Sequence, residues 1–166
     1  MPQINASLID RLTDKEPESR VEPVPLRTID IEDFKKSVCR DLEWLLNTRA
    51  SDPASLSDKR ELTVTDYGVP DFGDYFITGK DDQQRLEKNL ERAISAFEPR
   101  LQGIKVGIGP VDRDREDIPY EKSLRVIVEV VINGLIIAET DREPVAFSTV
   151  LEPKSGIGKL RESRPE

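Results

Sequence analysis

The apolar residues of this chain change their spacing halfway along the sequence. In the first half they recur at intervals of three and four residues, over 31–47 and again over 82–97. This interval places apolar side chains on one face of an α-helix. From residue 104 onward they alternate instead, which places them on one face of a β-strand. Helices followed by strands favour an α+β domain over the alternating order of a nucleotide-binding fold.

Both expected helices carry signals for their ends. Thr28 or Asp30 can cap the first helix, and Asp81 and Gln84 have the spacing of a capping box at the start of the second. The second helix should end at Glu98, because the residue before a proline avoids the helical conformation. The apolar face of the first helix comprises Ile31, Phe34, Val38, Leu42, Leu45 and Leu46.

The second half of the chain predicts strands over 104–108, 124–132, 135–141 and 145–151. Asn133-Gly134 separates two of them and is a strong signal for a hairpin turn. The sequence therefore predicts an α+β fold, in which two amphipathic helices pack on one face of a small, mostly antiparallel sheet with a β-hairpin. We expect a flexible arm with a short docking segment over 1–27, the domain over 28–151 and a polar tail over 152–166.

The amino-acid composition excludes several classes of function. The chain has no histidine and one cysteine, Cys39, so nucleophile pairs that need histidine and an internal disulfide are excluded, and we expect no metal or cofactor. The 33 acidic residues outnumber the 25 basic ones, and the net charge of −8 disfavours binding to nucleic acid. Because no apolar run is long enough for a membrane span or a signal peptide, we expect a cytoplasmic protein without membrane contact.

An apolar island interrupts the charged N-terminal arm. Within SLIDRL at 7–12, Leu8, Ile9 and Leu12 share one helical face. Two interpretations are open: a terminal turn held against the domain, or a short helix that docks into a partner's groove.

Four segments, in order along the chain, resemble the TssE family of type VI secretion baseplate subunits, whose relatives include a baseplate wedge protein of contractile-tailed phages. They are SLIDRL at 7–12, SVCRDLEWLLNTR at 37–49, DYGVPD at 66–71 and FEPRL at 97–101. The segment at 37–49 is the most specific, and Asp66 stands where asparagine is common in the family. The resemblance covers roughly residues 7–150.

The resemblance implies a structural role in the baseplate of a contractile injection machine. The family's Glu-Pro-Arg motif, here Glu98, Pro99 and Arg100, implies binding to the core bundle of the wedge, which TssF and TssG build in type VI systems. The sheath subunits are further implied partners, because the family's sheet is expected to be the first template on which sheath strands add. TssK is one more candidate partner.

The residues of the Glu-Pro-Arg motif suggest how this contact forms. Because Pro99 fixes the backbone just after a helix, Glu98 and Arg100 should project at a corner, where Arg100 can clamp a partner carboxylate. We expect replacement of Arg100 by alanine to weaken assembly and leave the fold intact. The alternative is a helix stop with solvated charges.

The strand at 124–132 is the candidate template for sheath strands. Its outer face carries Arg125, Ile127, Glu129 and Val131. At a sheet edge this strand would accept an extended segment from a neighbour. The alternative is a strand inside its own sheet.

An enzyme is the alternative function. A lysozyme-like glycosidase that cleaves peptidoglycan needs two carboxylates across a sugar-sized cleft, one of them with a raised pKa. Glu43 and Glu98 lie near Arg40 and Arg100 in sequence, and a neighbouring cation keeps a carboxylate ionised. Trp44 is expected to pack rather than to stack on a sugar. We therefore predict that the chain is not an enzyme; a small adaptor domain unrelated to secretion is a third class.

Overall fold

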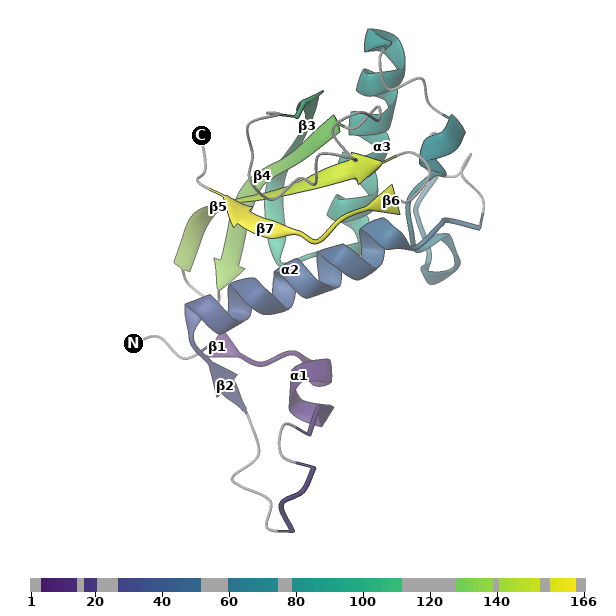
Figure 1. Ribbon diagram of the computed structural model, residues 1–166. Coiled ribbons are helices and arrows are strands. Elements are labelled where there is room, and N and C mark those ends of the chain that lie inside the picture. The colour runs from purple at the N-terminus through teal and green to yellow at the C-terminus, as the bar shows by residue number, and fades with distance from the viewer. Residues whose placement is uncertain are drawn as a thin grey trace.

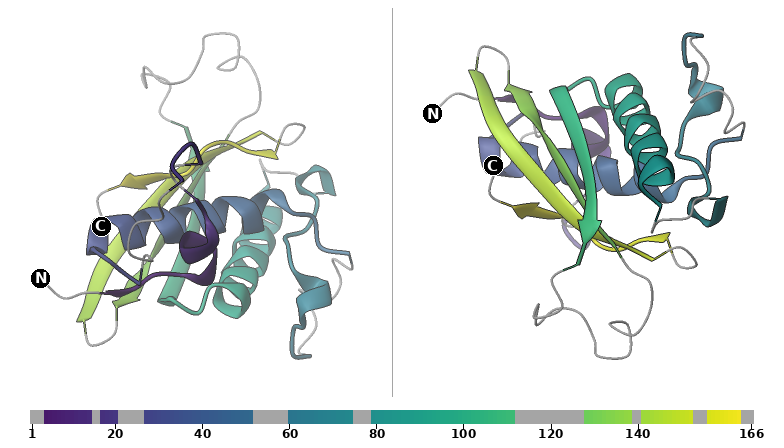
Figure 2. Two further views of the ribbon diagram at one scale, coloured as in Figure 1. Left: turned by 90° about the horizontal axis from the view of Figure 1, so that it is seen from below. Right: turned by 90° about the horizontal axis from the view of Figure 1, so that it is seen from above.

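One long helix crosses a face of an antiparallel sheet, and a second runs alongside the edge of that sheet (Figures 1 and 2). The computed structural model describes residues 4–14, 17–20, 27–51, 60–74, 79–111, 128–138, 141–152 and 156–163. The helices are α2 (Ile31–Asn47) and α3 (Lys80–Phe97), and the main strands, in spatial order, are β3 (Leu101–Pro110), β4 (Val128–Ala138) and β5 (Asp141–Glu152). Two short strands, β6 (Gly156–Ile157) and β7 (Arg161–Ser163), pair with the outer side of β5. This confirms the predicted α+β fold.

The hydrophobic core lies between the helices and the inner face of the sheet. The right-hand view in Figure 2 shows α2 behind the strands and α3 beside β3. Burial of apolar surface between these two layers is the main force that holds them together. Fully buried side chains in this layer include Leu42, Leu46, Leu86, Leu90, Ile94, Val130, Ile132, Ile136, Phe147 and Leu151.

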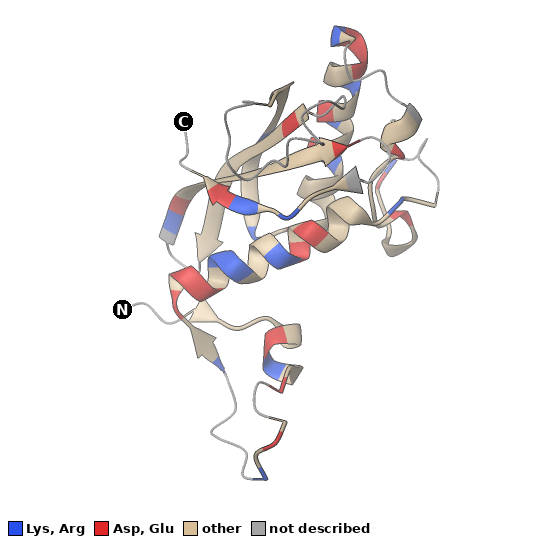
Figure 3. Ribbon diagram, in the orientation of Figure 1, with Lys and Arg blue, Asp and Glu red and all other residues tan. Residues whose placement is uncertain are grey.

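Helix α2 begins and ends where the sequence predicts. Asp30 caps it, because the Asp30 Oδ1 atom accepts a hydrogen bond from the Asp33 backbone N–H at 2.8 Å. The helix ends after Asn47, where the Thr48 hydroxyl donates to the Trp44 carbonyl at 2.7 Å. Charged residues of both signs follow its outer side (Figure 3). The capping residue and the apolar stripe therefore predict the same helix, and the structure contains it.

Helix α3 begins at Lys80, earlier than the predicted residue 82. Its N-cap is Gly79, which has no side chain to accept a hydrogen bond, so the predicted capping box of Asp81 and Gln84 is wrong. Asp81 lies in the first turn instead, where its negative charge interacts favourably with the helix dipole. The helix ends at Phe97, as the proline at position 99 predicts.

Asn133-Gly134 does not form the predicted hairpin turn, because β4 continues through both residues. The register between β3 and β4 shifts between Gln102 and Lys105, so a bulge of β3 lies opposite Gly134. A Cβ atom at position 134 would lie 3.3 Å from the Gln102 carbonyl oxygen. The glycine therefore allows two backbones to approach closely, and the hairpin connects β4 and β5 further along, between residues 138 and 141.

The segment predicted as a polar tail contributes to the sheet over 156–163. Ile157 and Leu160 are buried against the core, and the Leu160 N–H donates to the Glu43 Oε1 atom at 2.6 Å. This could not be predicted from the sequence, because two apolar residues among polar ones are too few to establish a period.

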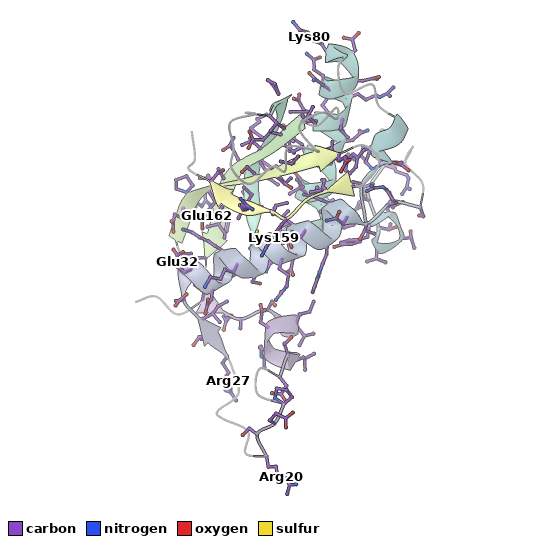
Figure 4. All side chains as sticks on the ribbon, in the orientation of Figure 1. Arg20, Arg27, Glu32, Lys80, Lys159 and Glu162 are labelled. Atoms are coloured by element: carbon purple, nitrogen blue, oxygen red, sulfur yellow. The ribbon has the colours of Figure 1, made fainter. Side chains whose placement is uncertain are left out.

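A buried lysine joins helix α2 to the outer strands. Lys35 is 7% exposed, and its Nζ atom forms ion pairs with Glu143 of β5 at 2.7 Å and Glu162 of β7 at 3.3 Å. Glu32 approaches the same nitrogen at 3.5 Å (Glu32 and Glu162 are labelled in Figure 4). The hydrogen bond to Glu143 raises the pKa of Lys35. These contacts hold β7 against α2.

Candidate docking groove

Two of the three segments predicted to bind partners meet in one groove, which we call the docking groove. It has a volume of about 390 Å³ and combines residues of the N-terminal helix α1 (Leu8–Leu12), of α2 and of the turn after α3. Its lining comprises Ser7, Leu8, Ile9, Asp41, Trp44, Leu45, Tyr67, Phe97, Glu98, Pro99 and Arg100. Leu12, the third predicted residue of the island, lies outside the lining and is 75% exposed.

Polar contacts hold α1 beside α2. Ser7 caps α1, with its Oγ atom accepting from the Asp10 N–H at 3.2 Å, and the Asp10 carboxylate forms an ion pair with Arg40 of α2. Burial raises the pKa of Asp10, but hydrogen bonds from Arg40, Ser7 and Ser37 outweigh it and lower the pKa to about 2. The Asp10 carboxylate is therefore charged at neutral pH, which the ion pair requires.

The N-terminal arm also returns to the domain through a short ladder. Strand β1 (Ile4–Asn5) pairs antiparallel with β2 (Thr28–Ile29), directly before α2, and Ile4 is buried. The apolar residues of α1 remain largely open to solvent: Leu8 is 67% and Ile9 46% exposed. The arm thus places an apolar surface at the groove without burying it in the chain's own core.

Arg100 forms the floor of the groove and does not project from a corner as the sequence predicted. Its guanidinium donates to the Glu98 Oε1 atom at 2.6 Å, to the Ser37 hydroxyl at 3.0 Å and to the Asp41 Oδ2 atom at 2.7 Å. Glu98 is only 3% exposed, whereas Pro99 between them is exposed. The charges turn inward because α2 offers Ser37 and Asp41 as partners, which the local sequence around 98–100 does not reveal.

The charge state of Arg100 follows from these contacts. Burial lowers the pKa of Arg100, but the hydrogen bonds and charges of Glu98 and Asp41 outweigh it and raise the pKa. Arg100 thereby pairs with two carboxylates, of which Glu98 is almost completely and Asp41 partly removed from water. It is a structural residue as well as a candidate contact, so its replacement cannot leave the fold unaffected.

Trp44 is the largest exposed apolar side chain at the groove and was not predicted to be there. It is 48% exposed, and the Arg40 guanidinium carbon lies 5.1 Å from the centre of its ring. Trp44 was expected to pack rather than to stack on a sugar; it contacts Arg40 while about half of its surface stays exposed. A signal existed in the sequence, because Trp44 falls between Leu42 and Leu45 and outside the helix stripe that they share.

The DYGVPD segment at 66–71 shapes the wall of the groove. Asp66 accepts two hydrogen bonds from Arg60, at 2.9 and 2.6 Å, and these bonds connect residues 60 and 66 of the loop. Tyr67 packs edge-to-face on Phe97, with ring centres 5.3 Å apart. At Gly68, φ is +128°, a conformation that L side chains rarely adopt.

The predicted template strand is central in the sheet and is not an edge. Between 128 and 132, β4 pairs with β3 on one side and with β5 on the other. Glu129 and Val131 are half-buried on the outer face, and Arg125 and Ile127 lie outside the described residues. An added strand therefore cannot pair with this part of β4, since its backbone hydrogen bonds are already made.

The carboxylates considered for a glycosidase are bound to other groups. Glu98 is paired with Arg100, and Glu43 accepts the Leu160 N–H. Within the described ranges, no group of three or more His, Cys, Asp or Glu residues could hold a metal ion. In the same part of the chain, no helix is both long and apolar enough to cross a membrane.

Comparison with known proteins identifies the family. The model of the family described as baseplate wedge protein gp25 matches residues 32–135. The chain belongs to the gp25 family of baseplate wedge proteins. This membership confirms the family resemblance inferred from the sequence. The match includes α2, α3 and the Glu-Pro-Arg turn of this gp25-family protein, whereas α1 lies outside it.

One solved structure adds a comparison at the level of whole chains. A chain in "The baseplate complex from the type VI secretion system" is 17% identical to this gp25-family protein, with a TM-score of 0.44. The alignment covers 80% of this chain and 96% of the other. No curated protein matches the sequence.

Proposed function

We propose that this chain is a non-enzymatic, cytoplasmic baseplate subunit of a type VI secretion machine, and that the docking groove binds the core bundle of the wedge, built by TssF and TssG. The observation that carries the proposal is the convergence of Leu8 and Ile9 with the turn at 98–100 in a single groove. Family membership supports the baseplate role. TssK and the sheath subunits are further proposed partners.

The composition of the groove suits an amphipathic helix from the partner. The rim is apolar and aromatic, with Trp44, Leu8 and Ile9 each at least 46% exposed. Apolar side chains on one face of a helix can enter such a groove at intervals of three and four residues. The floor is already neutralised, because Arg100 binds both Asp41 and Glu98. Contact energy should therefore come mainly from the rim, where an exposed tryptophan is the type of residue that dominates interfaces.

Replacing Trp44 with alanine should weaken binding to the TssF–TssG complex by about 30-fold or more, because a tryptophan anchor contributes about 2 kcal/mol or more to an interface. Binding of the purified proteins by calorimetry or biolayer interferometry measures this. The matched control is Val64→Ala, which removes a side chain that is 88% exposed and lies outside the groove lining. Equal affinities for the two variants would contradict docking through the groove.

We further propose that sheath segments add as strands on the β5 side of the sheet. Strands β6 and β7 already pair there, so this side has the geometry that an extended segment needs. In β7 the residues Arg161, Glu162 and Ser163 face Ser148, Phe147 and Ala146 of β5. The side of β7 away from β5 is the place where a further strand would pair.

Glu162→Pro should block sheath polymerisation seeded by the baseplate, because proline has no backbone N–H and is poorly tolerated in a strand that is paired on both sides. Glu162→Ala is the control, since it also removes the ion pair with Lys35 but keeps the N–H. Sheath length and number in electron micrographs report the result. Normal sheaths with the proline variant would count against strand addition at β7.

A further inference from the structure

We propose that Glu87 and Glu91 of helix α3 close the β3 edge of the sheet against strand addition. The Glu91 Oε1 atom accepts a hydrogen bond from the Val106 backbone N–H at 3.0 Å, and the Glu87 Oε1 atom accepts one from the Ile108 N–H at 2.9 Å. In β3, these two N–H groups point away from β4 and toward α3. An unpaired strand edge would present such groups to another chain.

The spacing of the two elements explains why a helix can take the place of a strand here. Residues four apart on a helix are separated by about 6 Å along its axis. Residues two apart on a strand are separated by about 6.6 Å. Glu87 and Glu91 therefore match Ile108 and Val106 in reverse order, as the residues of a neighbouring antiparallel strand would.

The next outward position of β3 has no donor to offer. Pro110 follows Ile108 in the same alternation, opposite Val128 of β4, and proline has no backbone N–H. Three successive outward positions are thus closed, two by carboxylates and one by proline. Proline on an edge strand and charged side chains along an edge are known ways in which proteins prevent strands from pairing with other chains.

An incoming strand would compete poorly with these glutamates. It offers neutral carbonyl oxygens, whereas a carboxylate makes a charge-assisted and therefore stronger hydrogen bond with an N–H group. Both glutamates are half-buried, which keeps them close to the strand. If sheath strands add to this sheet, which rests on the function proposed above, the closed β3 edge directs them to the β5 side. The closure itself concerns this chain alone and can be tested without a partner.

The test compares three double variants of α3 in the full chain. Glu87→Ala/Glu91→Ala removes both acceptors, Glu87→Gln/Glu91→Gln keeps an oxygen at each position, and Gln84→Ala/Lys88→Ala changes two exposed residues at the same spacing. Hydrogen exchange of the Val106 and Ile108 amides is measured by NMR, and self-association by sedimentation velocity. We expect the alanine pair to exchange both amides about tenfold faster and to form dimers through its opened β3 edges. The control pair should remain protected and monomeric. The glutamine pair, which keeps an oxygen at each position but loses the charge, should exchange both amides faster than the control pair and more slowly than the alanine pair.

The possible results of this test either support or overturn the proposed closure of the β3 edge. An alanine pair that stays monomeric, or dimers that form equally in the control pair, would overturn the closure. Unchanged exchange of both amides in the alanine pair would overturn it as well. If the double variant fails to fold, Glu87→Ala alone frees the Ile108 amide, and the same two measurements apply. A loss of sheath binding would bear on the proposed function and not on this result.

Discussion

Replacing Arg100 with alanine is expected to lower the free energy of unfolding by about 3–5 kcal/mol, because it leaves the buried carboxylate of Glu98 without its cation, whereas Asp41 keeps an ion pair with Arg40. The side chain of Glu98 is 4% exposed and that of Asp41 is 22% exposed, and both bind the Arg100 guanidinium. Water cannot replace the lost bonds at Glu98, so the cost of a buried, unpaired charge remains. Urea denaturation followed by circular dichroism measures the change.

Two further variants distinguish charge burial from loss of packing. In the Arg100→Ala background, Glu98→Gln should recover part of the lost stability, because it removes the unpaired charge. Lys36→Ala breaks an ion pair with Asp33 whose side chains are 75% and 49% exposed, and it should change stability little. An Arg100→Ala variant as stable as Lys36→Ala would show that the network contributes little. Because of this structural role, loss of partner binding by Arg100→Ala would not by itself demonstrate a contact.

Replacing Gly68 with alanine is expected to destabilise the fold by about 3 kcal/mol or more, through backbone strain and a steric clash. With φ at +128°, an added Cβ atom would lie 2.7 Å from the Ala50 nitrogen and 2.7 Å from the Thr48 carbonyl oxygen. Both atoms belong to backbone hydrogen bonds with Val69, each 2.9 Å long, so neither can move without breaking the bridge. A thermal melt should show a large fall in Tm.

The chain contains a matched control in the same loop region. At Gly73, an added Cβ atom would meet only the Asp71 Oδ1 atom, at 3.5 Å, which is ordinary contact. Gly73→Ala should therefore change stability by less than about 1 kcal/mol. Similar melting temperatures for the two variants would show that the loop at 66–71 can rearrange, and that Tyr67 is not rigidly held at the groove.

Several features of the fold could be predicted from the sequence because they depend on neighbours along the chain. The period of apolar residues determines α2 and α3, and Asp30 and Pro99 mark where one begins and the other ends. Alternation likewise determines that the second half forms strands. The sequence also identified Leu8, Ile9 and the Glu-Pro-Arg motif as candidate contacts, although it left them as separate segments.

Only the tertiary structure decided how these segments meet. Arg100 turns inward because Ser37 and Asp41 lie opposite it on α2, and Asn133-Gly134 stays in a strand because a β3 bulge passes over the glycine. The position of β4 between two strands depends in the same way on pairing across the chain. The helical spacing of apolar residues and their alternation along a strand are both visible within a few consecutive residues, so a short stretch of sequence is enough to recognise them. The residue that pairs with a charged side chain, or the strand that pairs with a sheet edge, depends on contacts between residues far apart in sequence. A short stretch of sequence does not contain both partners of such a contact.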